Sequence, residues 1–302
     1  MNWEAYAQCR LCPRACGVNR LQGERGYCGA SAQVELGRAA LHAWEEPSIS
    51  GVHGSGTVFF VHCTLGCIYC QNRQISTQRA NGITVDASRL AEIFLELQDQ
   101  KAQNINLVTA THYAPHVAAA VTEAKRQGLK IPVLLNCGGF ESLETLQMLE
   151  GIVDIYLPDL KYYSSYYAQM YSQAADYFEI ADAAIDAMVR QTGAPIFNAQ
   201  GNMKRGTLIR HLMLPGLAGD TRQILRHIAE RWGDRVLVSL MRQYTPIGME
   251  KYPELNRAIT EEEYQEAVTY FTDLGLAGYL QEGEAAQESF IPAFCGEGVK
   301  KD

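Results

Sequence analysis

Three cysteines directly follow an apolar run, and this stretch constrains the fold more than any other part of the chain. The run at residues 57–61 is β-branched and aromatic, which predicts a buried strand. Cys63, Cys67 and Cys70 follow in a C-x3-C-x2-C spacing, and Gly66 lets the backbone turn sharply between the thiols. The sequence therefore predicts a tight loop at the end of a strand, with three thiols on one side.

Three thiols are an odd number for a closed metal site. Structural zinc takes four ligands, and ordinary iron–sulfur clusters take four cysteines. A set of three therefore suggests a cluster with one iron left open for another ligand. Two other interpretations stay open: placement by chance, and three ligands of a zinc site that is completed elsewhere in the chain.

The spacing, with the aromatic Tyr69 just before the last cysteine, resembles that of the radical S-adenosylmethionine (SAM) enzymes. The resemblance implies a [4Fe-4S] cluster held by Cys63, Cys67 and Cys70, with SAM chelating the open iron. It also implies that SAM is cleaved reductively, and that a 5′-deoxyadenosyl radical abstracts hydrogen from a substrate. The electron would come from a low-potential donor such as a flavodoxin or ferredoxin.

Composition and charge limit the partners. Of the 302 residues, 47% are hydrophobic and 20% charged, as in a globular protein with a sizeable core. The net charge of -8 argues against nucleic acid or an anionic membrane, since both favour basic surfaces. No apolar run approaches ~20 residues, so no transmembrane helix is expected. The N-terminus lacks the features of a signal peptide.

The cysteines predict metal binding rather than disulfides. Seven of the nine lie in the first 70 residues at short spacings, which points to a reducing cytoplasm. Four form a loop-rich C-x2-C-x3-C-x11-C knuckle, sufficient for zinc or a second iron–sulfur cluster. The sequence does not choose between these, and the four need not share one metal. They are Cys9, Cys12, Cys16 and Cys28.

Strand and helix patterns alternate about six times along the middle of the chain, which predicts an α/β fold with a parallel sheet. Strands are expected near residues 57–61, 104–110, 131–136, 153–157, 208–214 and 235–240. Asp86 is expected to cap the first helix, and a long helical stretch is expected at 163–192. The pattern suits a partial (β/α)6 TIM-like barrel. The expected parts are a cysteine-rich extension (1–56), the barrel core (57–250), and a C-terminal helix and tail packing on it (251–302).

In barrels of this type the chemistry lies at the C-terminal ends of the strands. Asp159 and Lys161 are two apart at such an end, so they face the same side and suit a joint role, unless they form an ordinary ion pair. Arg210, in an otherwise apolar strand, needs a buried anion, and a carboxylate is its natural partner.

Nearly the whole chain also resembles the small activating enzymes of glycyl radical enzymes, of which pyruvate formate-lyase activating enzyme is the type. It is more similar still to a related branch that carries an N-terminal cysteine knuckle. Residues 159–161 match the Asp-Leu-Lys turn of these activases, which implies that Lys161 reaches the cofactor or substrate. The resemblance implies SAM-binding roles for Tyr69, Thr109, Thr111, Asn136, Asp159 and Arg210.

The chain departs from the activase pattern at three places. The Gly-Gly-Glu turn that holds the SAM amino group is replaced by residues 112–115, which leaves Thr109 and Thr111 as acceptors. Asn136 replaces an acidic residue, and Thr245 stands where the family has a catalytically placed histidine.

Three functions stay open. The first is activation of a glycyl radical enzyme, and the second is radical modification of another peptide or a small metabolite. The third is an iron–sulfur electron-transfer or metal-binding protein without SAM chemistry, which would leave Asp159, Lys161 and Arg210 without a purpose. A partly open barrel suits a protein or peptide substrate, although it equally admits a small molecule.

Overall fold

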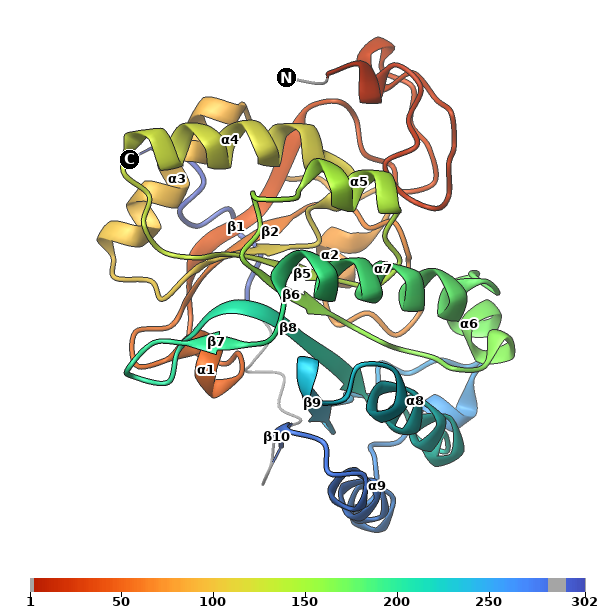
Figure 1. The fold of residues 1–302 in the computed structure, drawn as a ribbon. Coiled ribbons are helices and arrows are strands. Elements are labelled where there is room, and N and C mark those ends of the chain that lie inside the picture. Colours follow the sequence, from red (N-terminus) through yellow and green to blue (C-terminus); the bar gives the residue numbers. More distant parts are fainter. Residues whose placement is uncertain (1–2, 282–291, 302) are drawn as a thin grey trace.

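A mixed sheet runs through the computed structural model, which describes residues 3–281 and 292–301 (Figure 1). Its strands are β1 (Val34–His42), β2 (Ser55–Phe60), β3 (Ile83–Val85), β4 (Ile105–Val108), β5 (Val133–Cys137), β6 (Ile155–Pro158), β7 (Ile196–Phe197), β8 (Met203–Leu212), β9 (Leu237–Met241) and β10 (Gly278–Leu280). The order is β10-β9-β8-β6-β5-β4-β2-β1-β3, with β7 paired to β8.

The parallel part of the sheet extends from β2 to β10. All six predicted strands are present in it, and β10 adds a seventh. The fold is therefore α/β and of the partial TIM-like barrel type, as predicted, with the cysteine-rich segment at its N-terminus. The first two residues, residues 282–291 and the last residue of the predicted parts lie outside the described chain.

The helices are α1 (Pro47–Ser50), α2 (Arg73–Ser76), α3 (Ala87–Asp99), α4 (Ala114–Gln127), α5 (Leu143–Met148), α6 (Ser165–Ser172), α7 (Tyr177–Thr192), α8 (Ala218–Arg231) and α9 (Glu261–Asp273). Figure 1 shows α4, α5 and α7 side by side on one face of the sheet. Asp86 caps α3 as predicted, by accepting a hydrogen bond from the Arg89 amide at 2.7 Å.

The predicted helical stretch at 163–192 is two helices rather than one. Gln173 adopts a left-handed conformation (φ 49°) and ends α6, and α7 begins four residues later. Helical periodicity continues on both sides of this break, so the pattern alone does not reveal it.

The central strands β4, β5 and β6 are buried along nearly their whole length because both faces of the sheet are covered there. In β5, Leu134 and Leu135 are both fully buried, but they belong to different clusters on opposite faces. Leu135 packs in the main core with the helices, whereas Leu134 packs with Ile155 and Leu208. A continuous apolar run of this kind signals a central parallel strand.

Two antiparallel strands that the sequence does not predict extend the sheet beyond β2. β1 pairs with β2 and with β3. It carries charged residues inside the strand, Glu35 and Arg38, and Arg38 pairs with Glu297 at 2.9 Å. The C-terminal segment returns to this edge, where the Ala39 amide donates to the Glu297 carbonyl.

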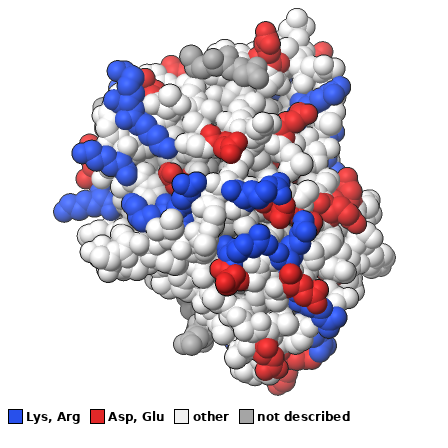
Figure 2. Space-filling model, viewed as in Figure 1, with Lys and Arg blue, Asp and Glu red and all other residues white. Residues whose placement is uncertain are grey.

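The outer surface does not concentrate one sign of charge on the face seen in Figure 2, where basic and acidic side chains are interspersed. Arginines of the outer helices pair with nearby carboxylates, as in Arg126–Glu123 (2.6 Å) and Arg222–Glu266 (2.7 Å). In the part of the chain that the structure describes, no helix is both long and apolar enough to span a membrane.

Candidate active site

A cavity of about 450 Å³ lies at the C-terminal ends of the parallel strands, within the size range of small-molecule sites. Most of the residues predicted from the sequence line it. They are Cys63, Cys67, Tyr69, Cys70, Thr109, Asn136, Asp159, Lys161 and Arg210. Thr111 and the four N-terminal cysteines lie outside this lining.

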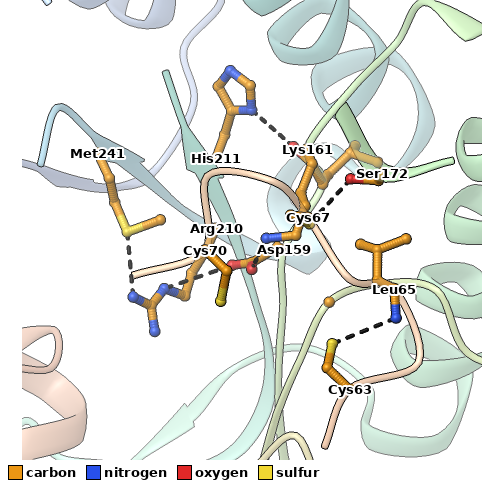
Figure 3. A network of polar contacts seen from close by, with 12 residues as sticks. Cys63, Leu65, Cys67, Cys70, Asp159, Lys161, Ser172, Arg210, His211 and Met241 are labelled. Atoms are coloured by element: carbon orange, nitrogen blue, oxygen red, sulfur yellow. Dashed lines mark hydrogen bonds and ion pairs between the residues drawn. The ribbon is translucent and has the colours of Figure 1, made fainter. Parts of the chain in front are cut away.

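The three cysteines of the loop after β2 each receive a hydrogen bond to sulfur, and Figure 3 shows those of Cys63 and Cys67. The Leu65 amide donates to Cys63 Sγ at 3.4 Å, Ser172 Oγ to Cys67 Sγ at 3.1 Å, and Ser76 Oγ to Cys70 Sγ at 3.4 Å. The donors come from the loop itself, from α6 and from α2. Such donors orient a thiolate and stabilise its negative charge.

Burial opposes the ionisation of two of these thiols, Cys63 and Cys70, and raises the pKa of each. Burial raises the pKa of Cys63 to about 12, and the neighbouring thiols of Cys67 and Cys70 raise it further. The Lys161 ammonium acts in the opposite direction on Cys70 and lowers its pKa, although burial dominates. A bound metal favours the thiolate form of its cysteine ligands and would offset this effect at Cys63 and Cys70.

Ser172 also begins a buried chain of hydroxyl groups. Its Oγ lies 2.8 Å from the Tyr162 hydroxyl, which in turn donates to the Tyr69 hydroxyl at 2.8 Å. Tyr69 and Tyr162 are almost completely buried. The aromatic residue of the cysteine loop is therefore fixed by the same network that reaches Cys67.

A network of five charged groups forms another part of the site, and Figure 3 shows three of them, Asp159, Lys161 and Arg210. Lys161 Nζ lies 2.5 Å from Asp159 Oδ2. Arg210 contacts three carboxylates: Glu45 through Nη1 at 3.1 Å, and Glu46 and Asp159 through Nε at 3.5 and 3.9 Å. The sequence predicts that Arg210 needs a buried anion, and in the structure carboxylates of the same chain meet this need.

The Arg210 network carries more acid than base, and this affects Glu45. Burial raises the pKa of the Glu45 carboxyl, while Arg210 lowers it. Glu45 also accepts a hydrogen bond from Asn106 at 3.0 Å. Among the described residues, the hydrogen bond of Arg210 Nη2 goes to the Met241 sulfur, a weak acceptor, at 3.4 Å. Arg210 therefore retains a donor with a poor partner at the cavity wall.

Glu141 is an acidic residue of the cavity wall that the sequence does not single out. It follows β5 and is only 3% exposed, and its Oε2 atom has no hydrogen-bond partner within residues 3–281 and 292–301. Burial raises its pKa to about 7, against the lowering effects of hydrogen bonds from Thr111 and Cys137. Thr111 therefore acts on the cavity indirectly, through Glu141.

The end of β4 is strained where it meets this cavity. Thr109 has φ 59°, a left-handed conformation that a β-branched residue rarely adopts. Its amide donates to the Asn136 carbonyl at 2.8 Å, so the strand continues to that point and then turns. Backbone strain of this kind is found where a site requires a particular carbonyl or hydroxyl direction.

The N-terminal cysteines gather in a separate segment that packs on α4 and α5. Three of them are 8–9% exposed (Cys9, Cys12 and Cys28), whereas Cys16 is exposed. The Tyr27 amide donates to Cys16 Sγ at 3.2 Å. Burial raises the pKa of Cys12 to about 12, with Cys28 among the neighbours that raise it further.

The donor sets fit thiolate-bound metal centres, and the cavity loop fits an iron–sulfur cluster. Among residues 3–281 and 292–301, no three His, Cys, Asp or Glu side chains converge as the ligands of a single ion would. In a [4Fe-4S] cluster each cysteine binds its own iron, so the sulfurs need not converge on one point. Three part-buried thiols, each with a donor to sulfur, meet that requirement.

Comparison with known proteins gives a family for this arrangement. A family model described as the Radical SAM superfamily matches residues 57–228, more than half of the chain. An uncharacterized protein of Methanocaldococcus jannaschii, MJ0674, is 28% identical over 271 residues, which cover 87% of this chain and 74% of that protein.

Solved structures with the same fold include two large proteins. Streptococcus suis SuiB bound to S-adenosylmethionine matches 74% of this chain and 49% of its own, with a TM-score of 0.51 and 13% identity. HydG, a maturase of the [FeFe]-hydrogenase, matches 76% of this chain and 51% of its own, also with a TM-score of 0.51 and 13% identity. The chain thus spans about half the length of these two proteins, and the likeness concerns the fold alone.

Proposed function

Because the chain belongs to the radical SAM superfamily, we propose that Cys63, Cys67 and Cys70 hold a [4Fe-4S] cluster and that the adjoining cavity binds SAM. When bound, the reduced cluster would supply one electron to the SAM sulfonium, whose S–C5′ bond would break to give methionine and a 5′-deoxyadenosyl radical able to remove a hydrogen atom from the substrate. The observation that carries the proposal is the set of three thiols, each with its own hydrogen-bond donor, on the wall of a cavity of small-molecule size.

The charges of the cavity wall suit the charges of SAM. Glu45, Asp159 and Glu141 provide three carboxyl groups, whereas Lys161 and Arg210 provide two cations. SAM carries a sulfonium, an ammonium and a carboxylate, with a net charge of +1. A wall with one excess carboxyl group therefore complements it. Arg210, with its poorly satisfied Nη2, is our candidate for the SAM carboxylate.

We further propose that Glu141 accepts the SAM ammonium, with Thr109 beside it. The chain lacks an acid in the turn after β4, but Glu141 brings one from the turn after β5. Its unpaired, buried oxygen requires a donor, and an ammonium group supplies one together with the charge that favours the ionised carboxylate.

Glu141→Gln is expected to weaken SAM binding about tenfold to a hundredfold, because a charged hydrogen bond contributes about 1.5–3 kcal/mol. In the wild type, SAM affinity should rise as the pH increases through about 7, where Glu141 ionises, and the variant should lose this rise. Titration calorimetry on the reconstituted protein measures both. Glu144→Gln, on α5, is the matched control. A variant with unchanged affinity and an unchanged pH profile would disprove the role.

Ser172→Ala is expected to lower the reduction potential of the site cluster. The Ser172 hydroxyl stabilises the added negative charge on Cys67, and its loss costs about 1 kcal/mol, or roughly 40 mV for a one-electron couple. A redox titration followed by electron paramagnetic resonance (EPR) measures the shift. Ser165→Ala lies on the exposed start of the same helix and should leave the potential unchanged.

As substrate we propose a protein or peptide segment, with a glycyl radical enzyme as the first candidate and another peptide or a small metabolite as the alternative. A cavity of about 450 Å³ is largely filled by a molecule the size of SAM, so a substrate must reach it from outside. The same fold in SuiB has been solved bound to its precursor peptide SuiA. A low-potential flavodoxin or ferredoxin in a reducing cytoplasm is the donor we propose.

The test is anaerobic reconstitution with iron and sulfide, reduction with dithionite, addition of SAM, and mass spectrometry for 5′-deoxyadenosine. Formation of 5′-deoxyadenosine supports SAM cleavage. Its absence from a protein with an intact cluster that does not bind SAM would favour an electron-transfer protein instead. Adding a candidate glycyl radical enzyme should then produce its EPR signal together with 5′-deoxyadenosine. If the glycyl radical enzyme shows no radical signal, another peptide or a small metabolite would be the substrate.

A further inference from the structure

We propose that the N-terminal cysteine knuckle, residues 9–28, positions the catalytic cysteine loop through Arg14 and Tyr27, and that a thiolate-bound metal in the knuckle supports this contact. The inference deepens the proposed function and rests on it, since the loop in question carries Cys63, Cys67 and Cys70. It gives a task to four cysteines that lie outside the cavity.

Arg14 donates hydrogen bonds to two separate elements of the site, the cysteine loop and the end of α6. Its guanidinium donates to the carbonyls of Thr64 (3.2 Å) and Leu65 (3.2 Å), in the loop between the first two cluster cysteines. It also donates to the carbonyls of Ser172 (2.9 Å) and Gln173 (2.6 Å), at the C-terminus of α6. All four acceptors are backbone carbonyls, so Arg14 holds the backbones of the cysteine loop and of α6 relative to each other. We therefore regard it as a positioning residue.

The α6 end of this contact matters for the sulfur of Cys67. The last carbonyls of a helix have no partner within it, and a cation there is favoured by the helix dipole. Arg14 binds the carbonyl of Ser172, and the side chain of the same residue donates to Cys67 Sγ. One side chain therefore fixes both the cysteine loop and the donor to its central sulfur.

Tyr27 reinforces the contact from the other end of the knuckle. Its hydroxyl donates to the Leu65 carbonyl at 3.3 Å, and its ring lies 4.0 Å from the Arg14 guanidinium carbon. Gly66, the turn residue of the cysteine loop, has φ 72°, and a Cβ there would come within 3.1 Å of the Tyr27 hydroxyl. The loop and the tyrosine thus pack closely at the turn between Cys63 and Cys67.

The positions of both residues depend on the cysteine segment. Arg14 lies between Cys12 and Cys16, and Tyr27 immediately precedes Cys28. The Tyr27 amide donates to Cys16 Sγ, and the Gly17 amide donates to the Cys9 carbonyl at 2.9 Å. A segment this short, built of turns and one short 3-10 helix (Arg20–Gln22), has little core of its own, and such segments are commonly stabilised by a metal.

The knuckle carries the thiols that a thiophilic metal requires, but within the described chain no three of them converge as the ligands of one zinc ion would. Zinc would therefore draw the sulfurs together, whereas in an iron–sulfur centre each cysteine binds its own iron. Four free cysteines lie in the knuckle. Arg20 is buried beside them, with Nη1 3.7 Å from Cys9 Sγ, and it also donates to the His112 carbonyl at 2.6 Å. Measuring the zinc and iron content of the protein distinguishes the two kinds of metal centre.

Arg14→Gln tests the contact, with Arg10→Gln as the matched control, because Arg10 is an exposed arginine of the same knuckle. The reconstituted proteins are challenged with a ferrous chelator, and site-cluster loss is followed by EPR of the reduced cluster. Arg14→Gln should lose the site cluster about tenfold faster and show altered g-values, while keeping the knuckle metal. Arg10→Gln should match the wild type. Unchanged rates and g-values in Arg14→Gln would overturn the proposal.

Cys16→Ser tests the metal, with Cys295→Ser as the control, since both cysteines are exposed. Cys16→Ser should lower the knuckle metal, counted as zinc or iron, and reproduce the faster site-cluster loss of Arg14→Gln. A knuckle that loses its metal without any change at the site cluster, or one that never contains metal, would overturn the coupling. Because the readout is cluster retention, these results do not depend on whether 5′-deoxyadenosine forms.

Discussion

Cys67→Ser is expected to abolish the site cluster and with it all formation of 5′-deoxyadenosine. Cys67 is the central thiol of the loop, and it carries the hydrogen bond from Ser172 at 3.1 Å. A serine hydroxyl is a hard, weakly acidic ligand, whereas iron–sulfur clusters select soft thiolates. Two remaining thiolates cannot replace the third, because the open iron is needed for SAM. Iron and sulfide analysis, with EPR of the reduced protein, measures the loss.

Two variants separate this effect from general damage to the fold. Cys295→Ser removes an exposed thiol near the C-terminus and should retain full iron and activity. Cys137→Ser removes a buried thiol that lines the same cavity and contacts Glu141, so it should keep the cluster while changing the cavity wall. A Cys67→Ser protein with wild-type iron and 5′-deoxyadenosine would show that the loop is not the cluster site.

The elements that the sequence predicts well are those whose signal is local. The six parallel strands are short apolar runs buried on both faces, and such runs are visible without knowledge of their neighbours. β1 is different, because Glu35 and Arg38 interrupt its apolar pattern. Arg38 finds its partner in Glu297, near the other end of the chain, in a part-exposed ion pair beside β1.

The residues of the candidate site also fall into two groups, those with a local sequence signal and those without one. The cysteines, Asp159, Lys161 and Arg210 stand at strand ends, and parallel topology brings strand ends together. Ser172, Tyr162 and Glu141 are ordinary residues of helices and turns in the sequence. Their roles depend on contacts that the fold creates. Ser172, for example, contacts Cys67 although the two are 105 positions apart in the sequence. A residue whose role is to touch a distant atom leaves no pattern of its own.

Arg14 shows what a motif can and cannot reveal. Its place in a cysteine knuckle is visible in the sequence, where it serves equally well as a counter-charge for thiolates or as a solvated basic residue. The structure instead directs its guanidinium at the carbonyls of another loop and of α6. The target could not be predicted, because backbone carbonyls carry no sequence signal.

Arg210→Met is expected to destabilise the protein by about 3–5 kcal/mol, the cost of removing one partner from a buried ion network. The Arg210 side chain is 14% exposed, and those of Glu45 and Glu46 are 8% and 7% exposed. Without the guanidinium, these carboxylates remain buried beside Asp159 with no compensating cation except Lys161. Chemical denaturation at pH 7, with an unchanged slope, measures the loss.

The pH dependence of this loss has a definite sign. Burial already raises the pKa of Glu45, and removing Arg210 removes a group that lowers it. A carboxyl whose pKa is higher in the folded than in the unfolded protein binds its proton more tightly when folded. The deficit of Arg210→Met should therefore be smallest below the unfolded pKa of about 4.3. It should grow as the pH rises through the raised folded value.

Arg205→Met is the matched control, because Arg205 lies on the same strand, is exposed, and bonds only a carbonyl, that of Gln191, at 2.8 Å. The double variant Glu45→Gln with Arg210→Met should recover part of the stability, since it removes an uncompensated charge together with the cation. If this stable double variant still binds SAM normally, Arg210 serves the acids of its own chain and another group holds the SAM carboxylate. If SAM binding is lost, Arg210 serves both, and Glu45 fixes the guanidinium that meets the cofactor.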